Sequence, residues 1–288
     1  MKKLLWCVIL LSAMACKHDN TVVIGSKNFS EQILLGEILA QKIEQSGIKV
    51  KRKLNLGGSF ICQKALLSGD IDLYVEYTGT AYTAILKRNP KSDERSVFNE
   101  VKDAYHSQYH LAVLPSLGFN NTFAIIIRGA EAKQLGIHTI SEAAAYTPKW
   151  KAGFGYEFME RKDGFPGLAA AYGLKFAEPP KVMDLTLTYR AVADKEVDMI
   201  AGNSTDGLIQ KLDLFVLEDD KHYFPPYEAV PVVRENTLAR YPQLENIIPS
   251  LAGKISADKM RAMNLAVDGQ HREVRDVAAE FLKGVPNQ

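Results

Sequence analysis

The sequence is poor in cysteine and has no marked excess of charge of either sign. Only 3 of the 288 residues are cysteine, and 35 Lys and Arg stand against 34 Asp and Glu, which gives a formal net charge of +1. So few cysteines make no disulfide framework, and no Cys-x-x-Cys pair offers a metal or redox site. The longest basic run, Lys49–Lys53, is typical of a solvated strand or helix end, so nucleic acid is not an expected partner.

The catalytic motifs that sequence alone can reveal are also missing. There is no Gly-x-Ser-x-Gly elbow, no P-loop, no His-Glu-x-x-His pair and no dinucleotide fingerprint. His106 and His110 lie four residues apart without a third ligand nearby, which favours a surface pair over a zinc site. We therefore expect a binding protein that is not an enzyme and that uses neither a metal nor another cofactor.

Long apolar runs are missing as well, and the short one at the start has the features of a leader. Met1–Lys3 is basic, Leu4–Leu11 is apolar and Ala13–Ala15 is a small-x-small cleavage site, so residues 1–15 are predicted to be a signal peptide. No later stretch approaches the roughly 20 apolar residues of a membrane helix. Cys16 follows as in the lipobox of bacterial lipoproteins, which predicts an exported, periplasmic or cell-envelope protein anchored by a lipid on Cys16. Ala13 stands where Leu is preferred, so simple cleavage before Cys16 is the alternative.

The rest of the chain alternates between β-rich runs and amphipathic segments. Strands are predicted at 21–25, 50–56 and 71–77, with helices at 31–45 and 59–67 between them. Such alternation argues for a mostly parallel sheet covered by helices, with Cys62 as a buried small hydrophobe on the second helix. A similar alternation restarts near residue 151 and ends near residue 202, and the segment 235–283 is helical.

Two distant segments contain the same structural features in the same order. Ser68–Gly79 and Lys195–Gly207 each contain a polar turn, an apolar strand with an Asp, and a Gly/Ser/Thr loop that opens a helix. Two facing α/β lobes would place these loops at the carboxyl ends of their strands, where open sheets bind ligands. Ser26–Asn28 and Tyr77–Thr80 would then confront Tyr156–Arg161 and Asn203–Asp206 across one cleft. The alternative is that both segments are ordinary strand–loop–helix connections.

Aromatic and basic side chains mark these loops. The aromatic residues at or near strand ends include Tyr77, Phe123, Tyr156 and Tyr227, and they accompany Lys27 and Arg161. Aromatic faces attract a cation that cannot donate hydrogen bonds, and Arg can bind a carboxylate with two parallel bonds. A site with both features suits a zwitterion that carries a quaternary ammonium group, although each ring taken singly can be core packing.

Five motifs stand out along the chain: Gly25–Gln32 (GSKNFSEQ), Gly69–Thr80 (GDIDLYVEYTGT), Phe119–Thr122 (FNNT), Ser204–Gly207 (STDG) and Pro225–Arg234 (PPYEAVPVVR). In these motifs, their order and their spacing, the sequence resembles the glycine betaine/choline-binding proteins of osmoprotectant ABC importers over about residues 21–283.

The resemblance implies an α/β, two-lobed periplasmic-binding-protein fold of type II. Each lobe would be a mixed sheet flanked by helices, and two crossover strands, Phe123–Arg128 and Tyr227–Val233, would act as the hinge. Residues 21–124 and 225–288 would form lobe 1, and residues 125–224 would form lobe 2.

The resemblance also implies roles for individual residues. Lys27, Thr80 and Arg161 match carboxylate-binding positions, and Tyr77 and Tyr227 match aromatic cage positions. The full predicted ligand-binding set is Lys27, Asn28, Tyr77, Thr80, Asn121, Phe123, Tyr156, Arg161, Asn203 and Tyr227.

Two positions depart from the pattern of these proteins. Phe123 and Asn203 both stand where betaine binders often carry Tyr. Asn offers hydrogen bonds but no π face. The departure leaves room for carnitine, choline or a histidine-derived betaine as well as glycine betaine.

The expected function is an extracytoplasmic solute-binding protein of an ABC importer. It would capture a quaternary-ammonium compound between its lobes and deliver it to permease subunits on a separate chain. A ligand-sensing module of the same fold, signalling through a membrane receptor, is the alternative.

Overall fold

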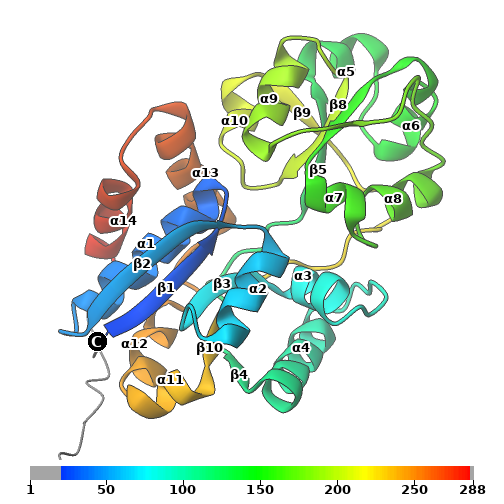
Figure 1. Ribbon diagram of the computed structural model, residues 1–288. Helices are drawn as coiled ribbons and strands as arrows, with labels where there is room; N and C mark the ends of the chain where they lie inside the picture. The colour runs from blue at the N-terminus through cyan, green and yellow to red at the C-terminus, as the bar shows by residue number, and fades with distance from the viewer. Residues whose placement is uncertain (1–20, 286–288) are drawn as a thin grey trace, which may run out of the picture.

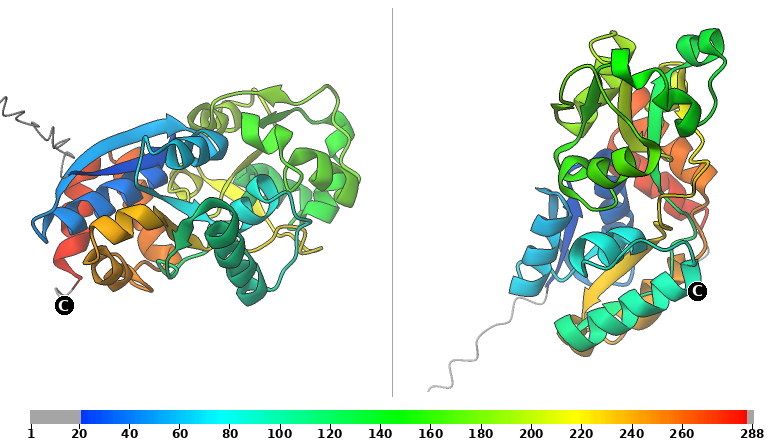
Figure 2. Two further views of the ribbon diagram at one scale, coloured as in Figure 1. Left: turned by 60° about the horizontal axis from the view of Figure 1, so that its bottom comes forward. Right: turned by 90° about the vertical axis from the view of Figure 1, so that its right-hand side faces the viewer.

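Residues 21–285 form two lobes, each built on a five-stranded sheet, in the computed structural model (Figure 1). The predicted signal peptide over residues 1–15 and Cys16 lie outside the described residues. Two turned views show the lobes side by side with the helices of each lobe wrapped around its own sheet (Figure 2).

The first lobe contains the sheet with the strand order β2-β1-β3-β10-β4. Strand β1 is parallel to β2 and β3, whereas β10 is antiparallel to both β3 and β4, so the sheet is mixed. Its strands are β1 (Thr21–Lys27), β2 (Lys49–Gly57), β3 (Leu73–Tyr77), β4 (Leu111–Val113) and β10 (Ala229–Arg234).

Helices cover both faces of this sheet because apolar side chains line both faces. Helix α2 ends at Gly69, whose φ of 82° lies in the left-handed region that glycine adopts without strain. The helices of the first lobe are α1 (Ser30–Glu44), α2 (Ser59–Ser68), α3 (Thr78–Thr80), η1 (Ala81–Ile85), α4 (Glu94–Tyr109), α11 (Glu235–Arg240), α12 (Leu244–Ile247), η3 (Pro249–Leu251), α13 (Ala257–Asn264), η4 (Leu265–Gly269) and α14 (Val274–Lys283).

The second lobe repeats the plan, with the strand order β7-β6-β8-β5-β9. Its fourth strand, β5, is again antiparallel to both neighbours. The strands are β5 (Phe123–Arg128), β6 (Ala152–Phe154), β7 (Lys181–Val182), β8 (Met199–Asn203) and β9 (Leu214–Leu217), and the helices are α5 (Gly129–Leu135), α6 (Ile140–Ala144), η2 (Thr147–Lys149), α7 (Tyr156–Glu160), α8 (Phe165–Tyr172), α9 (Leu185–Ala193) and α10 (Leu208–Lys211).

The internal repeat of the sequence corresponds to this repeated plan. Tyr77 ends the third strand of the first sheet and Asn203 ends the third strand of the second. Tyr77 pairs with Ala229 of the antiparallel fourth strand, and Asn203 pairs in the same way with Phe123. The two residues therefore occupy equivalent positions in the two sheets.

The chain crosses between the lobes at residues 114–122 and 218–228. These segments meet in an antiparallel bridge between Asn120 and Glu228, and the Asn121 amide donates to the Tyr227 carbonyl at 3.0 Å. The strands expected as the hinge, β5 and β10, begin directly after these crossing segments and pair within the second and the first sheet. The expected boundary between residues 124 and 125 falls inside β5, whose first residue already pairs with β8.

Most predicted elements agree with the structure, and the mixed sheets flanked by helices are confirmed. The short edge strands β4 and β9 were not predicted, because three or four residues carry too little pattern. Cys62 is buried on α2 as expected, and burial raises the pKa of its thiol to about 12. Between residues 21 and 285, no helix is long and apolar enough to cross a membrane, and no cluster of three or more His, Cys, Asp or Glu side chains could hold a metal ion.

Candidate functional site

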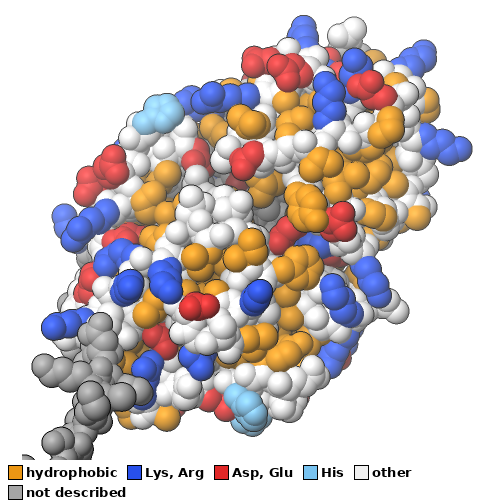
Figure 3. Space-filling view, viewed as in Figure 1, with side chains coloured by type: hydrophobic (Ala, Val, Ile, Leu, Met, Phe, Trp, Pro, Cys, Tyr) orange, Lys and Arg blue, Asp and Glu red, His pale blue; other side chains and the backbone are white. Residues whose placement is uncertain are grey.

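A cavity of about 490 Å³ lies between the two lobes. Its walls come from the loops after β1 and β3 and the start of α2 on one side, and from α7, the end of β8 and residues 182–185 on the other. The surface is hollowed where the lobes meet (Figure 3). All ten predicted ligand-binding residues line this cavity, so the structure brings the whole set together, while their contacts with a ligand stay a prediction.

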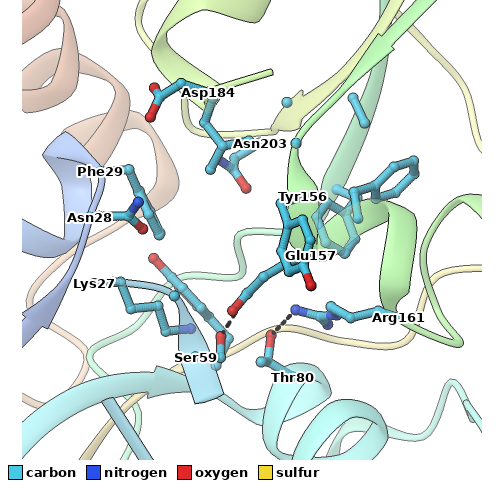
Figure 4. Close-up of a pocket in the computed structure, with 18 of the residues that line it drawn as sticks. Lys27, Asn28, Phe29, Ser59, Thr80, Tyr156, Glu157, Arg161, Asp184 and Asn203 are labelled. Atoms are coloured by element: carbon cyan, nitrogen blue, oxygen red, sulfur yellow. Dashed lines mark hydrogen bonds between the residues drawn. The ribbon is translucent and has the colours of Figure 1, made fainter. Parts of the chain in front are cut away.

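Arg161 is buried in the cavity wall and is held from both lobes. Its Nε and Nη2 donate to the two carboxylate oxygens of Asp163 at 2.9 and 2.5 Å, and its Nη1 donates to Thr80 Oγ1 of the first lobe at 3.0 Å (Figure 4). Burial acts to raise the pKa of Asp163, but the charge and hydrogen bonds of Arg161 outweigh it and hold that pKa below its ordinary value. Three of the five guanidinium N–H donors are thus engaged, which leaves one on Nη1 and one on Nη2 for a carboxylate of the ligand.

The predicted cage rings already face cations of the protein. The Arg161 guanidinium lies 5.0 Å from the Phe123 ring and 5.9 Å from the Tyr227 ring, and Lys27 Nζ lies 4.8 Å from the Tyr77 ring. Lys27 is also paired with the buried carboxylate of Glu76. Neither cation is therefore a free charge, because each has its own carboxylate. Arg161 covers part of two rings and Lys27 covers part of one, so only the remaining ring surfaces are open to a ligand.

The most exposed aromatic rings of the site lie nearer the mouth of the cavity than the buried rings of Tyr77 and Tyr227. Tyr156 and Phe60 are 67% and 41% exposed, against 5% for Tyr77 and 2% for Tyr227. Further apolar lining residues come from both lobes: Phe29, Ile61, Phe158, Val182, Met183 and Leu185. Hydrophobic side chains gather on both sides of the junction in Figure 3. The cavity thus has a polar end at Arg161 and an apolar arm toward the mouth.

Sequence reasoning missed several lining residues, of which Glu157 and Ser59 form a contact between the lobes. Ser59 Oγ donates to Glu157 Oε2 at 3.2 Å, which ties the first turn of α2 to α7 (Figure 4). Asp184 also lines the cavity, but its carboxylate caps α9 by accepting from the Thr186 amide at 2.8 Å. Glu157 lies inside the predicted Tyr156–Arg161 segment, so placing that whole segment on a helix at the cavity would have identified Glu157 as a lining residue.

Glu31 joins the lobes behind the cavity. Its Oε1 accepts from the Tyr77 hydroxyl and the Asn121 amide at 2.5 and 2.8 Å, and its Oε2 accepts from the Thr205 hydroxyl and the Asn264 amide at 2.5 and 2.8 Å. Burial raises the pKa of Glu31 despite these four donors. The carboxylate therefore links the first lobe, a crossing segment and the loop after β8.

A second carboxylate, Asp206, lies in that same loop. Its Oδ2 accepts from the Tyr189 hydroxyl, from the Asn203 backbone amide at 3.0 Å and from the Asn203 side-chain Nδ2 at 3.2 Å. Burial raises the pKa of Asp206 to about 7, well above the ordinary value of an Asp. These bonds fix the end of β8 and with it one wall of the cavity.

The raised pKa of Asp206 predicts an unusual pH dependence of stability. Between about pH 4 and pH 7 the native state holds a proton that the unfolded chain has lost, so stability falls as the pH rises through this range. Glu31 acts in the same direction. We expect a higher thermal midpoint at pH 5.5 than at pH 8 by calorimetry, and a smaller difference in Asp206→Asn.

Asp220→Asn is the matched control for this experiment. The pKa of Asp220 is lowered, chiefly by its hydrogen bond with Ser141, so this group is ionised in both states over the same pH range. Its replacement should leave the pH difference unchanged. An equal pH difference in wild type and Asp206→Asn would contradict the prediction.

Comparisons with known proteins agree with this architecture. Residues 20–284 match the family described as the substrate binding domain of the ABC-type glycine betaine transport system. A crystal structure described as a glycine betaine/carnitine/choline ABC transporter shares 34% identity and a TM-score of 0.75, covering 91% of this chain and 97% of its own. These matches confirm the predicted two-lobed, type II fold.

Two curated relatives differ in the ligand that their names state. The ergothioneine transport permease/ergothioneine binding protein EgtU of Helicobacter pylori (strain G27) is 35% identical over 92% of this chain, which spans 48% of the length of that relative. The carnitine transport binding protein OpuCC of Listeria monocytogenes (serotype 1/2a, strain 10403S) is 33% identical over 95% of this chain and 89% of its own length. The relatives thus agree on substrate binding for transport and differ on the compound.

Proposed function

The chain belongs to the family of substrate-binding domains of ABC-type glycine betaine transport systems, and we propose that it captures a zwitterionic quaternary-ammonium compound between its two lobes. Substrate-binding proteins of ABC importers work outside the cytoplasm. In our proposal the loaded protein delivers its ligand, chemically unchanged, to permease subunits on a separate chain, and a lipid on Cys16 holds it at the membrane.

The buried Arg161 beside two aromatic rings carries the proposal. One N–H on each of Nη1 and Nη2 is left to bind a carboxylate, and the ring surfaces of Phe123 and Tyr227 that Arg161 leaves open would contact an apolar cation. Choline lacks a carboxylate and would leave that end of the guanidinium without an acceptor. A zwitterion satisfies both parts of the site.

The size and lining of the cavity favour a ligand longer than glycine betaine. A volume of about 490 Å³ falls within the roughly 300–1,000 Å³ of pockets that hold drug-sized ligands. The apolar arm of Tyr156, Phe60 and Leu185 would remain without a partner beside a compound as small as glycine betaine. Carnitine and the histidine-derived betaine ergothioneine, the compounds named in the two relatives, both extend further.

A thermal-shift panel tests the proposal. A ligand at 100 times its Kd stabilises the native state by about 2.7 kcal/mol, so a raised unfolding midpoint identifies binders. We expect shifts with ergothioneine, carnitine or glycine betaine, smaller shifts with choline, and none with amino acids or sugars. Mass spectrometry should recover each bound compound unchanged. Shifts with sugars or ordinary amino acids, and none with any quaternary amine, would overturn the proposal.

A further inference from the structure

The side-chain amide of Asn203 has a fixed orientation at the cavity wall. Its Nδ2 donates to Asp206 Oδ2 at 3.2 Å. This oxygen already accepts from the Tyr189 hydroxyl and the Asn203 backbone amide, so it acts as an acceptor and the side-chain amide nitrogen is the atom on that side. Asn203 lines the cavity, and its amide points toward it (Figure 4). The remaining polar atom, Oδ1, is a hydrogen-bond acceptor on the side away from Asp206.

Asp206 is itself held in place, so the amide cannot easily turn over. The same Oδ2 accepts from the Tyr189 hydroxyl and from the Asn203 backbone amide, which lies 3.3 Å from the Tyr189 oxygen. A reversed amide would set Oδ1 against the carboxylate oxygen and lose the bond at 3.2 Å. Asp206 and Tyr189 therefore act as positioning residues for Asn203.

No donor within residues 21–285 reaches Asn203 Oδ1, and the residue is only partly buried at the cavity. A ligand that fills the cavity would take water away from this oxygen. A buried acceptor without a donor is costly, whereas a trimethylammonium group offers no N–H or O–H to it. Among quaternary ammonium ligands, only one that also carries an N–H or O–H donor can therefore form a hydrogen bond with Asn203 Oδ1.

We propose that the ligand carries an N–H or O–H donor in addition to its trimethylammonium group, and that Asn203 Oδ1 accepts its hydrogen bond. This inference rests on the proposed function and narrows its substrate class from quaternary ammonium compounds in general to those that also carry an N–H or O–H donor. Asn203 then selects against betaines that lack the donor, because a site built to hydrogen-bond one group rejects analogues without it.

Two matched pairs of compounds test the proposal by isothermal titration calorimetry. L-carnitine differs from γ-butyrobetaine only by a hydroxyl, and N,N,N-trimethylhistidine carries an imidazole ring with an N–H where N,N,N-trimethylphenylalanine carries a phenyl ring without a donor. The wild type should bind the donor-bearing member of at least one pair about tenfold more tightly. Equal binding within twofold in both pairs would overturn the inference while leaving the proposed function intact. Failure to bind any quaternary amine would instead overturn the proposed function.

Variants of Asn203 and Asp206 test whether Asn203 causes the preference for the donor-bearing compounds. Asn203→Leu has a similar shape without the acceptor, so it should weaken the donor-bearing compound about tenfold and its partner less than threefold. Asn203→Tyr should invert the preference by adding a π face. Asp206→Asn keeps an acceptor for the Asn203 amide and should retain the discrimination, whereas Asp206→Ala should reduce it. Equal weakening of both compounds in Asn203→Leu would contradict the inference, and if this variant does not fold, the wild-type comparison alone decides.

Discussion

Replacing Arg161 with methionine should destabilise the protein strongly even without a ligand. The Asp163 side chain is 0% exposed, and in the variant it would lose both bonds from the guanidinium while keeping the one from the Tyr227 hydroxyl at 2.6 Å. Removing one partner of a buried ion pair typically costs about 3–5 kcal/mol, because the other charge is left without compensation. Denaturant unfolding of Arg161→Met should show a loss of this size.

The double variant Arg161→Met/Asp163→Asn should recover much of that loss. The amide that replaces the Asp163 carboxylate would carry no charge and would still accept from Tyr227, so no buried charge remains uncompensated. A double-mutant cycle with Asp163→Asn then gives the coupling energy of the pair. Losses in the double variant that equal the sum of the two single variants would contradict the pairing as the source of the effect.

The folded double variant also separates ligand binding from folding. It should weaken carboxylate-bearing quaternary amines more than choline, because only the former lose a charged partner at the Nη1–Nη2 end. Equal losses for both would mean that Arg161 acts through its bond to Thr80 of the first lobe rather than on the ligand carboxylate. Measuring binding in Arg161→Met alone would mix these effects with instability.

Gly207→Ala should lower ligand affinity by about 5–150-fold. A Cβ at this position would lie 2.4 Å from the backbone nitrogen and 2.5 Å from the Cα of Leu265 in the other lobe. Backbone atoms cannot turn aside as the end of a side chain can, so the lobes would have to separate there. Overpacking of this kind typically costs about 1–3 kcal/mol, which is the basis of the expected loss.

Alanine can adopt the backbone conformation of Gly207 without strain. Its φ of −68° and ψ of −22° are helical, so the effect would come from the lobe contact and not from strain. Small-angle scattering should show a wider arrangement of the lobes in Gly207→Ala. Gly284→Ala is the matched control, since its Cβ would meet only a carbonyl oxygen at 3.5 Å. Unchanged affinity and scattering in Gly207→Ala would contradict the lobe contact described for this loop.

The sequence by itself determined most elements of both lobes and ten of the residues that line the cavity. Apolar spacing along α1 and β3 is local, so it predicted their type from a few residues. Strand-end loops of parallel strands meet at one edge of a sheet, which is why ten residues chosen from sequence motifs line one cavity. The equivalence of Tyr77 and Asn203 followed from the repeated order of strand, loop and helix.

Only the tertiary structure decided which polar groups of the site pair with one another. Lys27 pairs with Glu76 across 49 residues, and Glu31 bonds to Thr205 across 174, and such distant partners leave no periodic pattern in a sequence. Asp163 stands two residues from Arg161, yet their pairing depends on burial that sequence alone does not show. The orientation of the Asn203 side chain likewise depends on Asp206. A freely rotating amide can present either its oxygen or its nitrogen to the cavity, and the bond from Nδ2 to Asp206 leaves the oxygen on the cavity side.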